Sequence, residues 1–391
     1  MKYLNRKSFA LYLMGMCCVV LLGLWTGCEF DIGDDDDDDN GSFALETFSV
    51  SSTRIDLTWD YDLDPEEGFT IERDSEYGGI EEIAQLDAGV SWYSDSALAP
   101  GTRYTYRVCG YGASGIIGCS SWSSSTTFND SRTMIFADHT STDIEAVPAD
   151  WIEQAKETLH IAYGHTSHGS QLTTGMAGLV SFLGDGYAFA SGGTGGALDL
   201  RDTPFSGALD LGNPDRTSWA TATRNYLDAH PEVNVVIWSW CGQVSTATED
   251  DIETYLSLMT GLEEDYPDVF FVYMTGHLDG TGLEGNLHLR NTQIRTYCRE
   301  NAKVLYDFAD IETYDPDGTY FGDNYPDDGC NYDSDGNGSL DANWAIEWQG
   351  SHVEGVDWYD CPSAHSQPLN ANLKAYAAWW LWARLAGWPG E

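Results

Sequence analysis

The sequence Tyr-Gly-His-Thr-Ser-His-Gly-Ser-Gln spans residues 163 to 171 and follows an apolar run, Leu159 to Tyr163, that is typical of a buried strand. Behind it, apolar residues recur three and four positions apart, as on one face of a helix: Leu172, Met176, Leu179, Val180 and Leu183. A strand-to-helix turn of this kind lies at the carboxyl edge of a parallel sheet, where α/β enzymes place their chemistry. We therefore predict that Ser167 is a hydroxyl nucleophile.

Apolar runs alternate with helical patterns throughout residues 133–388. The runs that predict strands are Leu159 to Tyr163, Val233 to Trp240, Val269 to Met274 and Lys303 to Phe308. The helical patterns cover residues 217–229, 249–265 and 286–302, and an aromatic amphipathic helix, Asn370 to Trp388, is expected to pack on the sheet. This alternation predicts a three-layer α/β domain with a parallel sheet.

Residues 43–128 show a different pattern, in which short alternating runs are separated by turn residues. The runs are Arg54 to Trp59, Phe69 to Glu72, Ser91 to Tyr93, Tyr104 to Cys109 and Ile116 to Trp122. Their spacing predicts an all-β sandwich. The stretch Leu98 to Val108 resembles the turn and tyrosine corner of fibronectin type III domains, with Trp59 at the core tryptophan position. This resemblance implies a spacing or binding module, so we expect catalysis in the second domain.

The first 27 residues have the layout of a bacterial secretion signal, with basic residues, an apolar stretch from Phe9 to Leu24, and Trp25-Thr26-Gly27-Cys28. They resemble a lipoprotein signal peptide, which implies lipidation of Cys28 and a lipid-anchored protein of the bacterial cell envelope, at the outer membrane or cell surface. Trp25 departs from the family motif, so an ordinary signal peptide or an uncleaved anchor remain alternatives. Residues 28–42 contain the run Asp34 to Asp39 and predict a solvated acidic linker.

The formal net charge is −45, from 63 acidic and 18 basic residues. Such a charge disfavours nucleic acids and anionic membrane surfaces as partners. No segment after the signal is apolar enough to predict a membrane span. We therefore expect contact with the membrane only through the N-terminal lipid.

Six of the nine cysteines remain once Cys17, Cys18 and the lipidated Cys28 are set aside, and the predicted compartment permits disulfides. Cys109 and Cys119 suit a bridge across a hairpin. The other pairs that we predict are Cys330 with Cys361, which bracket an acidic segment, and Cys241 with Cys298, by elimination. Zinc is not expected at these cysteines, because no Cys-x-x-Cys or paired-His spacing accompanies them.

The order of elements in residues 133–388 resembles that of the SGNH (GDSL-like) hydrolases, which are esterases with a flavodoxin-like sheet. Their first strand leads into the nucleophile, here Ser167 in His-Thr-Ser-His-Gly. A later strand ends in Gly-x-Asn, here Cys241-Gly242-Gln243, and an Asp and a His precede the last helix, here Asp360 and His365.

The resemblance implies a catalytic set of Ser167 as nucleophile, His365 as base and Asp360 as its orienting acid, with Gly242 and Gln243 at the oxyanion site. Asp360 stands five residues before His365 rather than three, so Asp357 or a carbonyl oxygen remains an alternative orienting group. No cofactor is expected for this chemistry.

Three further histidines stand near the predicted catalytic edge. His165 and His168 flank Ser167, and His277 follows the strand Val269 to Met274. We assign all three to substrate binding, with a structural role as the alternative for His277. Their separation in sequence gives no metal-ligand spacing.

The segment from Asp333 to Asp341 matches the start of a calcium loop, with ligands expected at Asp333, Asp335, Asn337 and Asp341. Counted from Asp333, position 12 of the loop is Trp344, where calcium loops of this kind have a Glu that binds the ion with both carboxylate oxygens. We predict a structural Ca²⁺ ion, and the alternative is a solvated loop held by its own turns.

These patterns together predict a secreted, lipid-anchored serine esterase that deacylates glycans. The glycan substrate is implied by the family resemblance, by the fibronectin-like companion, and by 15 Trp and 22 Tyr residues available for sugar stacking. The alternative is a catalytically inactive surface protein that binds glycans or mediates adhesion.

Overall fold

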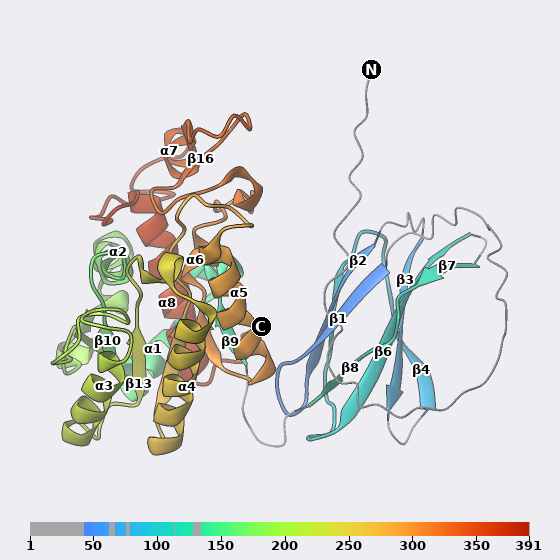
Figure 1. Cartoon of the computed structure of the whole chain (residues 1–391), viewed down its shortest axis with the longest axis horizontal. Helices are drawn as coiled ribbons and strands as arrows, with labels where there is room; N and C mark the ends of the chain where they lie inside the picture. Colours follow the sequence, from blue (N-terminus) through green and yellow to red (C-terminus); the bar gives the residue numbers. More distant parts are fainter. Residues whose placement is uncertain (1–42, 62–66, 76–78, 114, 128–133, 391) are drawn as a thin grey trace, which may run out of the picture. The chain divides into compact units, whose positions relative to one another are not determined.

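The computed structural model describes residues 43–61, 67–75, 79–113, 115–127 and 134–390. The predicted signal peptide, the lipidation site at Cys28 and the acidic linker lie outside the described residues. The described residues form a β-sandwich and an α/β domain (Figure 1).

The sandwich, residues 43–127, consists of two antiparallel sheets. One sheet has the order β1 (Phe43–Ser49), β2 (Ile55–Tyr61) and β5 (Trp92–Asp95). The other has the order β4 (Gly79–Leu86), β3 (Gly68–Ser75), β6 (Arg103–Gly112) and β7 (Gly115–Cys119), and β8 (Ser123–Thr126) also pairs with β6. Alternate side chains of these strands point inward, as the period of two predicts, and they close a core around Trp59, Phe69 and Tyr106.

The predicted tyrosine corner is present in the sandwich. The hydroxyl oxygen of Tyr104 accepts a hydrogen bond from the backbone N–H of Ala99 at 3.0 Å. This bond ties the turn before β6 to the strand itself. Trp59 is buried, with 5% of its surface exposed, as its position in the sequence predicts.

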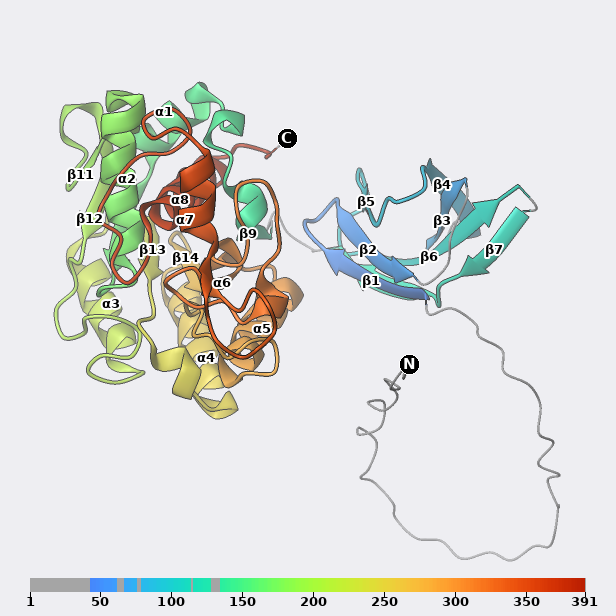
Figure 2. The same ribbon diagram turned by 90° about the horizontal axis from the view of Figure 1, so that it is seen from above.

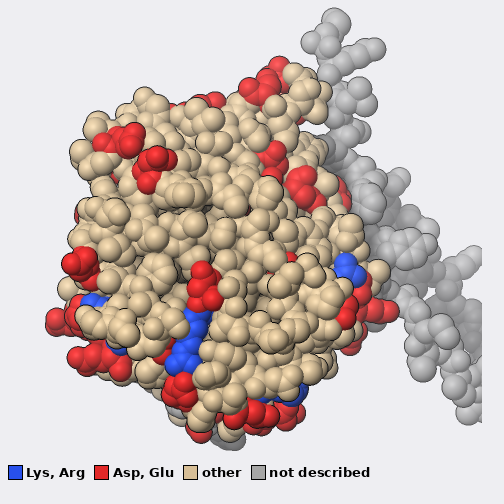
Figure 3. Space-filling model, turned by 90° about the vertical axis from the view of Figure 1, so that its left-hand side faces the viewer, with Lys and Arg blue, Asp and Glu red and all other residues tan. Residues whose placement is uncertain are grey.

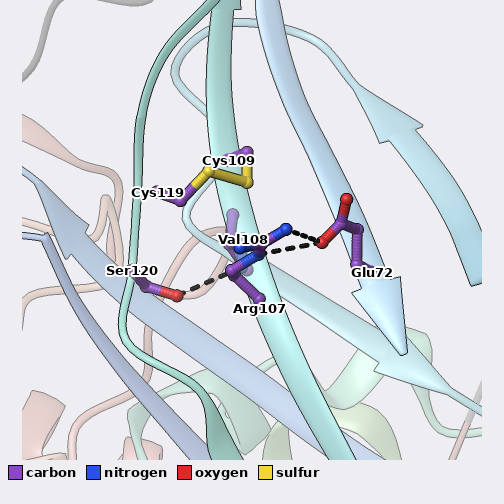
Figure 4. Close-up of a disulfide and its surroundings, with 6 residues drawn as sticks. All are labelled: Glu72, Arg107, Val108, Cys109, Cys119 and Ser120. Atoms are coloured by element: carbon purple, nitrogen blue, oxygen red, sulfur yellow. Dashed lines mark hydrogen bonds and ion pairs between the residues drawn. A yellow bond between two sulfur atoms is a disulfide. The ribbon is translucent and has the colours of Figure 1, made fainter. Parts of the chain in front are cut away.

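The disulfide between Cys109 and Cys119 joins directly opposed residues of β6 and β7 (Figure 4). Beside it, Ser120 Oγ accepts a hydrogen bond from the Val108 N–H at 3.1 Å, and Arg107 pairs with Glu72. The hairpin disulfide predicted from the sequence is therefore confirmed.

The α/β domain contains a seven-stranded parallel sheet. Its order is β11 (Phe189–Ala190), β12 (Leu198–Asp202), β10 (His160–Gly164), β13 (Val235–Trp238), β14 (Phe270–Met274), β15 (Val304–Tyr306) and β9 (Ile135–Ala137). Five neighbouring strands of the sheet are β12, β10, β13, β14 and β15, and they follow the order 2-1-3-4-5 when numbered along the chain. The chain moves to opposite sides of β10 to form β12 and β13, so the order reverses beside β10.

Helices cover both faces of this sheet (Figure 2). One face packs against α1 (Ala149–Thr158), α2 (Ser170–Leu183) and α8 (Pro368–Leu385), and the other packs against α3 (Ser218–Ala229), α4 (Glu249–Asp265) and α5 (Asn286–Glu300). The α/β architecture with a parallel sheet that the sequence predicts is confirmed. No helix among the described residues combines the length and apolarity needed to cross a bilayer.

The segment after β15 supplies a cap of short elements. They are α6 (Phe308–Ile311), α7 (Trp344–Ser351) and a small antiparallel pair, β16 (Asn331–Tyr332) with β17 (Ala342–Asn343). Trp344, Trp358 and Tyr359 of this segment join the same core cluster as α8. Helix α8 is therefore buried almost all round, including its polar residues Asn370, Asn372 and Lys374.

Candidate functional site

The turn between β10 and α2 carries Ser167 at the carboxyl edge of the sheet. The Tyr163 hydroxyl donates a hydrogen bond to the Gly169 carbonyl oxygen at 2.9 Å, which ties the turn to β10. A Cβ at Gly164 would come within 2.2 Å of the Trp238 ring, and one at Gly169 within 2.2 Å of the Ser239 hydroxyl. Both glycines are therefore needed for the turn to pack against the end of β13, and Ser167 itself is partly exposed.

Cys241 follows β13 and lies opposite this turn. Its Sγ is 3.6 Å from Ser167 Oγ and 3.2 Å from His168 Nδ1. Because β10 and β13 flank the point where the strand order reverses, these groups occupy the crevice in which open α/β sheets bind ligands.

Asp328 is the carboxylate that lies beside His168. Its Oδ2 is 2.8 Å from His168 Nε2. Burial alone raises the pKa of Asp328, but the hydrogen bond with His168 and the neighbouring imidazoles outweigh burial and leave this pKa below its usual value. Burial lowers the pKa of His168, although the bond to Asp328 opposes the shift. The pair is therefore a neutral imidazole held by an ionised carboxylate.

Two more imidazoles stack on His168. The ring centroid of His277 lies 3.7 Å away with an interplanar angle of 7°, and that of His365 lies 4.4 Å away at 15°. His277 Nδ1 is 2.7 Å from the Leu278 carbonyl oxygen, so this nitrogen carries the proton. His277 Nε2 is buried without a hydrogen-bond partner among the described residues. His365 is exposed and has a positive φ of 64°.

A buried ion pair beneath the imidazoles positions two of them. Lys374 Nζ lies 2.6 Å from Glu312 Oε1, and both side chains are fully buried. Glu312 Oε2 accepts the N–H of Leu278, the residue after His277, at 2.8 Å. Lys374 also donates to Gln171, whose Nε2 donates to the carbonyl oxygen of Ala364, the residue before His365, at 2.5 Å. The network thus holds the backbone beside His277 and beside His365.

The structure does not bring Asp360 to His365. Asp360 is exposed, and its carboxylate has no hydrogen bond or ion pair with an imidazole among the described contacts. Asp357 instead accepts the N–H of Val353 at 2.8 Å. The carboxylate at the imidazoles is Asp328, which the sequence did not indicate as a member of the catalytic set.

The side-chain amide of Gln243 is engaged within its own loop. Its Nε2 donates to Asp210 Oδ1 at 3.1 Å, and its Oε1 accepts the N–H of Cys241 at 2.8 Å. A Cβ at Gly242 would lie 3.7 Å from His277 Nε2, so Gly242 lines the space beside the imidazoles. Gln243 therefore shapes the turn after β13.

His165 lies away from the imidazole stack. Its Nε2 is 2.5 Å from Asp202 Oδ1 and its Nδ1 is 2.9 Å from the Thr166 carbonyl oxygen. Both ring nitrogens have partners, so His165 anchors the turn to the end of β12. The substrate contact predicted for His165 stays a prediction.

The predicted calcium segment forms the loop between β16 and β17. The Asp333 carboxylate accepts backbone N–H groups of Gly336, Asn337 and Gly338 at 2.7 to 3.1 Å, and Asp341 accepts the N–H of Ser334 at 3.0 Å. Among the described residues, the carboxylates of Asp333, Asp335 and Asp341 do not converge within 4.8 Å of one another. Calcium binding at this loop stays a prediction.

The two other predicted disulfides are not formed, and Cys241, Cys298, Cys330 and Cys361 are free thiols. Cys241 follows the carboxyl end of β13, whereas Cys298 lies in the last turn of α5, which returns to the opposite edge of the sheet. Cys330 Sγ contacts Ser366 Oγ at 3.4 Å, and Cys361 Sγ contacts Asn372 at 3.5 Å. Burial raises the pKa of both Cys330 and Cys361 to about 12.

A cavity of about 230 Å³ opens among residues that neighbour the site along the chain, although Ser167, His168, His277, Asp328 and His365 do not line it. It is lined by Leu278 and Asp279, which follow His277, and by Pro326, which precedes Asp328 by two residues. Tyr314 and Tyr320 add aromatic walls. On the face shown in Figure 3, acidic side chains are scattered widely and basic ones are few.

No protein-family model and no curated protein sequence matches the chain. Solved structures match over the sandwich. They include the fibronectin type III domain of human fibronectin type III domain containing protein 3 (17% identity, 26% of this chain, 94% of that chain, TM-score 0.20). The FN5 domain of Drosophila Lar also matches (18% identity, 22% of this chain, 94% of that chain, TM-score 0.19). Pectate lyase PelI from Erwinia chrysanthemi matches with 22% identity over 21% of this chain and 28% of that chain (TM-score 0.20). Residues 43–127, with their two sheets, buried Trp59 and Tyr104 corner, form a fibronectin type III-like sandwich.

Proposed function

We propose that the α/β domain is a serine ester hydrolase of the SGNH type with Ser167 as its nucleophile. The observation that carries this proposal is the position of Ser167, partly exposed at the switch point of a parallel sheet. Cys241 Sγ contacts both Ser167 Oγ and His168, and His168 belongs to a stack of three imidazoles with one carboxylate. The strand order 2-1-3-4-5, which flavodoxin-like sheets share, supports the family assignment.

His365 is the proposed base. Both ring nitrogens of His168 are engaged, by Cys241 and Asp328, whereas those of His365 make no hydrogen bond among the described contacts. Ser167 must turn from Cys241 toward His365, which takes its proton as Oγ attacks the acyl carbon. The imidazolium then protonates the leaving alcohol, and water hydrolyses the acyl-serine by the same steps in reverse.

Asp328 replaces Asp360 as the proposed acid of the catalytic set. Ligand atoms of Asp328, His168 and His365 all lie within 4.8 Å of one another, so an ionised Asp328 stabilises the imidazolium that forms on His365. Because the Gln243 amide is engaged by Asp210, the proposed oxyanion donors are backbone N–H groups of the turn after Ser167 and of the loop at Gly242.

The proposed substrates are acylated glycans. The cavity near Leu278 and Pro326 would suit a sugar unit, because the partly exposed ring of Tyr320 offers an aromatic surface for stacking. The strongly negative chain disfavours polyanionic substrates. We further propose that the protein is anchored at the bacterial envelope through Cys28, on the basis of the N-terminal sequence alone.

The second candidate function is an inactive glycan-binding or adhesion protein. It is favoured by two departures at the site: Asp360 is exposed without a hydrogen bond to an imidazole among the described contacts, and the Gln243 amide is bound within its own loop. In that case the cavity would bind a sugar without turnover.

An ester-hydrolysis assay separates these functions. The full chain should hydrolyse p-nitrophenyl acetate, and Ser167→Ala should remove that activity with an unchanged melting temperature. Ser339→Ala, at an exposed loop serine, is the matched control and should behave as wild type. Equal activity of the Ser167→Ala variant would contradict the mechanism, and inertness of the wild type toward a panel of acyl esters would favour the binding protein.

A further inference from the structure

We propose that His168, Asp328 and His365 form a binding site for a divalent transition-metal ion, zinc above all. The three residues come from distant segments: the turn after β10, the cap after β15 and the turn before α8. The site itself is independent of the proposed hydrolase, and only its inhibitory consequence rests on that function.

The distances are close to those of a metal centre. One ligand atom from each residue lies within 4.8 Å of the other two, and His168 Nε2 and Asp328 Oδ2 are already 2.8 Å apart. Bonds of about 2.0 to 2.1 Å around tetrahedral zinc place ligand atoms roughly 3.3 Å apart. His365 is exposed, which leaves room for its ring to shift toward the ion.

The surrounding groups orient His168 for such binding. With a metal on Nε2, the proton of His168 resides on Nδ1 and is donated to Cys241 Sγ, 3.2 Å away. Outer hydrogen bonds of this kind fix the tautomer and ring angle of metal-bound histidines. The nearly parallel ring of His277, itself held by Leu278, stacks on His168 and limits its rotation.

An unsatisfied nitrogen lies in the same stack. His277 Nε2 is buried and has no partner among the described residues, beside Gly242. A buried polar atom without a partner is costly unless water, an ion or a ligand satisfies it. A hydrated ion at the neighbouring residues would bring water to this nitrogen.

The donor set selects the kind of metal. Two imidazole nitrogens and one carboxylate suit zinc and related ions, whereas Ca²⁺ and Mg²⁺ prefer oxygen ligands alone. Three protein ligands leave a fourth position for water. The second such group among the described residues, Asp138, His139 and Asp310, offers a single imidazole with two carboxylates, so we do not assign it.

Zinc at this site should inhibit ester hydrolysis. The ion would take the lone pair of His365, the proposed base, and the charge of Asp328, the proposed acid. Zinc binding and ester hydrolysis would therefore require the same two side chains, His365 and Asp328.

The test is a zinc titration of the chelator-treated full chain, in competition with a chromophoric chelator at neutral pH. The wild type should bind one zinc ion per chain. His365→Ala and Asp328→Asn should each weaken binding by more than about tenfold. His352→Ala is the matched control, because His352 stacks on Trp348 outside the cluster, and it should bind as wild type.

Wild-type binding that none of these substitutions changes, or no stoichiometric binding by the wild type, would overturn the proposal. Because His365 is exposed, its variant should fold, and a melting curve checks this. Cobalt substitution gives a second readout, since tetrahedral Co²⁺ absorbs strongly in the visible range and the His365→Ala variant should lose that spectrum. Zinc binding without any esterase activity would contradict the proposed hydrolase and leave the metal site standing.

Discussion

Nε2 of His168 and Oδ2 of Asp328 lie 2.8 Å apart, although the two residues are 160 positions apart in the chain. The contact joins the turn that carries Ser167 to the cap that follows the last central strand. It gives the site an ionised carboxylate at the imidazoles. The chemistry proposed for the site therefore depends on Asp328 more than on any acid near His365 in sequence.

Asp328→Asn should lower kcat for p-nitrophenyl acetate by about 10² to 10⁴, because the imidazolium would lose its stabilising charge. Asp360→Asn is the matched control and should stay within about twofold of the wild type, since Asp360 is exposed and has no ion pair with an imidazole among the described contacts. Steady-state kinetics of the two variants decide whether Asp328 or Asp360 is the acid of the catalytic set. A large loss in the Asp360 variant with little change in the Asp328 variant would restore the acid predicted from sequence.

Lys374→Met should destabilise the α/β domain by about 3 to 5 kcal/mol, because it leaves the Glu312 carboxylate buried and unpaired. The pKa of Lys374 is lowered by burial, against the opposing effect of Glu312. The double variant Lys374→Met with Glu312→Gln should recover part of the lost free energy of unfolding. Urea denaturation measures both, and an unchanged free energy of unfolding in the single variant would contradict a stabilising role of the ion pair.

His139 should make stability depend on pH. Its Nδ1 lies 2.5 Å from Asp310 Oδ2, and although burial lowers the pKa of His139, the bond to Asp310 outweighs burial and raises it. A raised folded pKa stabilises the protein below the unfolded value of about 6.5, and this contribution is lost as pH rises through the folded pKa. The free energy of unfolding should therefore fall as pH rises above about 6.5.

The control for this pH dependence is His139→Gln. Its free energy of unfolding, measured by urea denaturation over the same pH range, should change less than that of the wild type. Identical slopes for the two proteins would assign the dependence to other groups.

Calcium should raise the melting temperature of chelator-treated protein if the loop between β16 and β17 binds it, because an ion that binds only the native state stabilises it. Asp335→Ala should erase that shift. The alternative is a loop held by its own turns, since Asp333 already accepts three backbone N–H groups. An unchanged melting curve at millimolar calcium would support this alternative.

Local patterns predicted the elements around the site well. The helical period over residues 249–265 matches α4, and the apolar run Leu159 to Tyr163 matches β10 to within one residue at each end. Both signals are local, because the burial of one helix face or of a whole strand shows in the spacing of apolar residues within that segment. The edge strands β9 and β11, of three and two residues, are too short to show any period.

The missed parts depend on contacts between distant segments. Asp328 lies in an acidic stretch where many carboxylates look alike, and only the fold brings this one to His168. The disulfide predictions failed for the same reason: elimination paired Cys241 with Cys298 although they lie at opposite edges of the sheet. By contrast, the Cys109 to Cys119 bridge spans a single hairpin, which the sequence itself indicates.

The most direct test of Ser167 as the nucleophile is labelling of the full chain with a fluorophosphonate, followed by mass-spectrometric mapping of the modified peptide. We predict a stoichiometric adduct on Ser167 that is absent from the Ser167→Ala variant and slowed in the His365→Gln variant. Cys241, 3.6 Å away, should remain unmodified. An unlabelled wild-type protein, or an adduct mapped to a residue other than Ser167, would contradict the account.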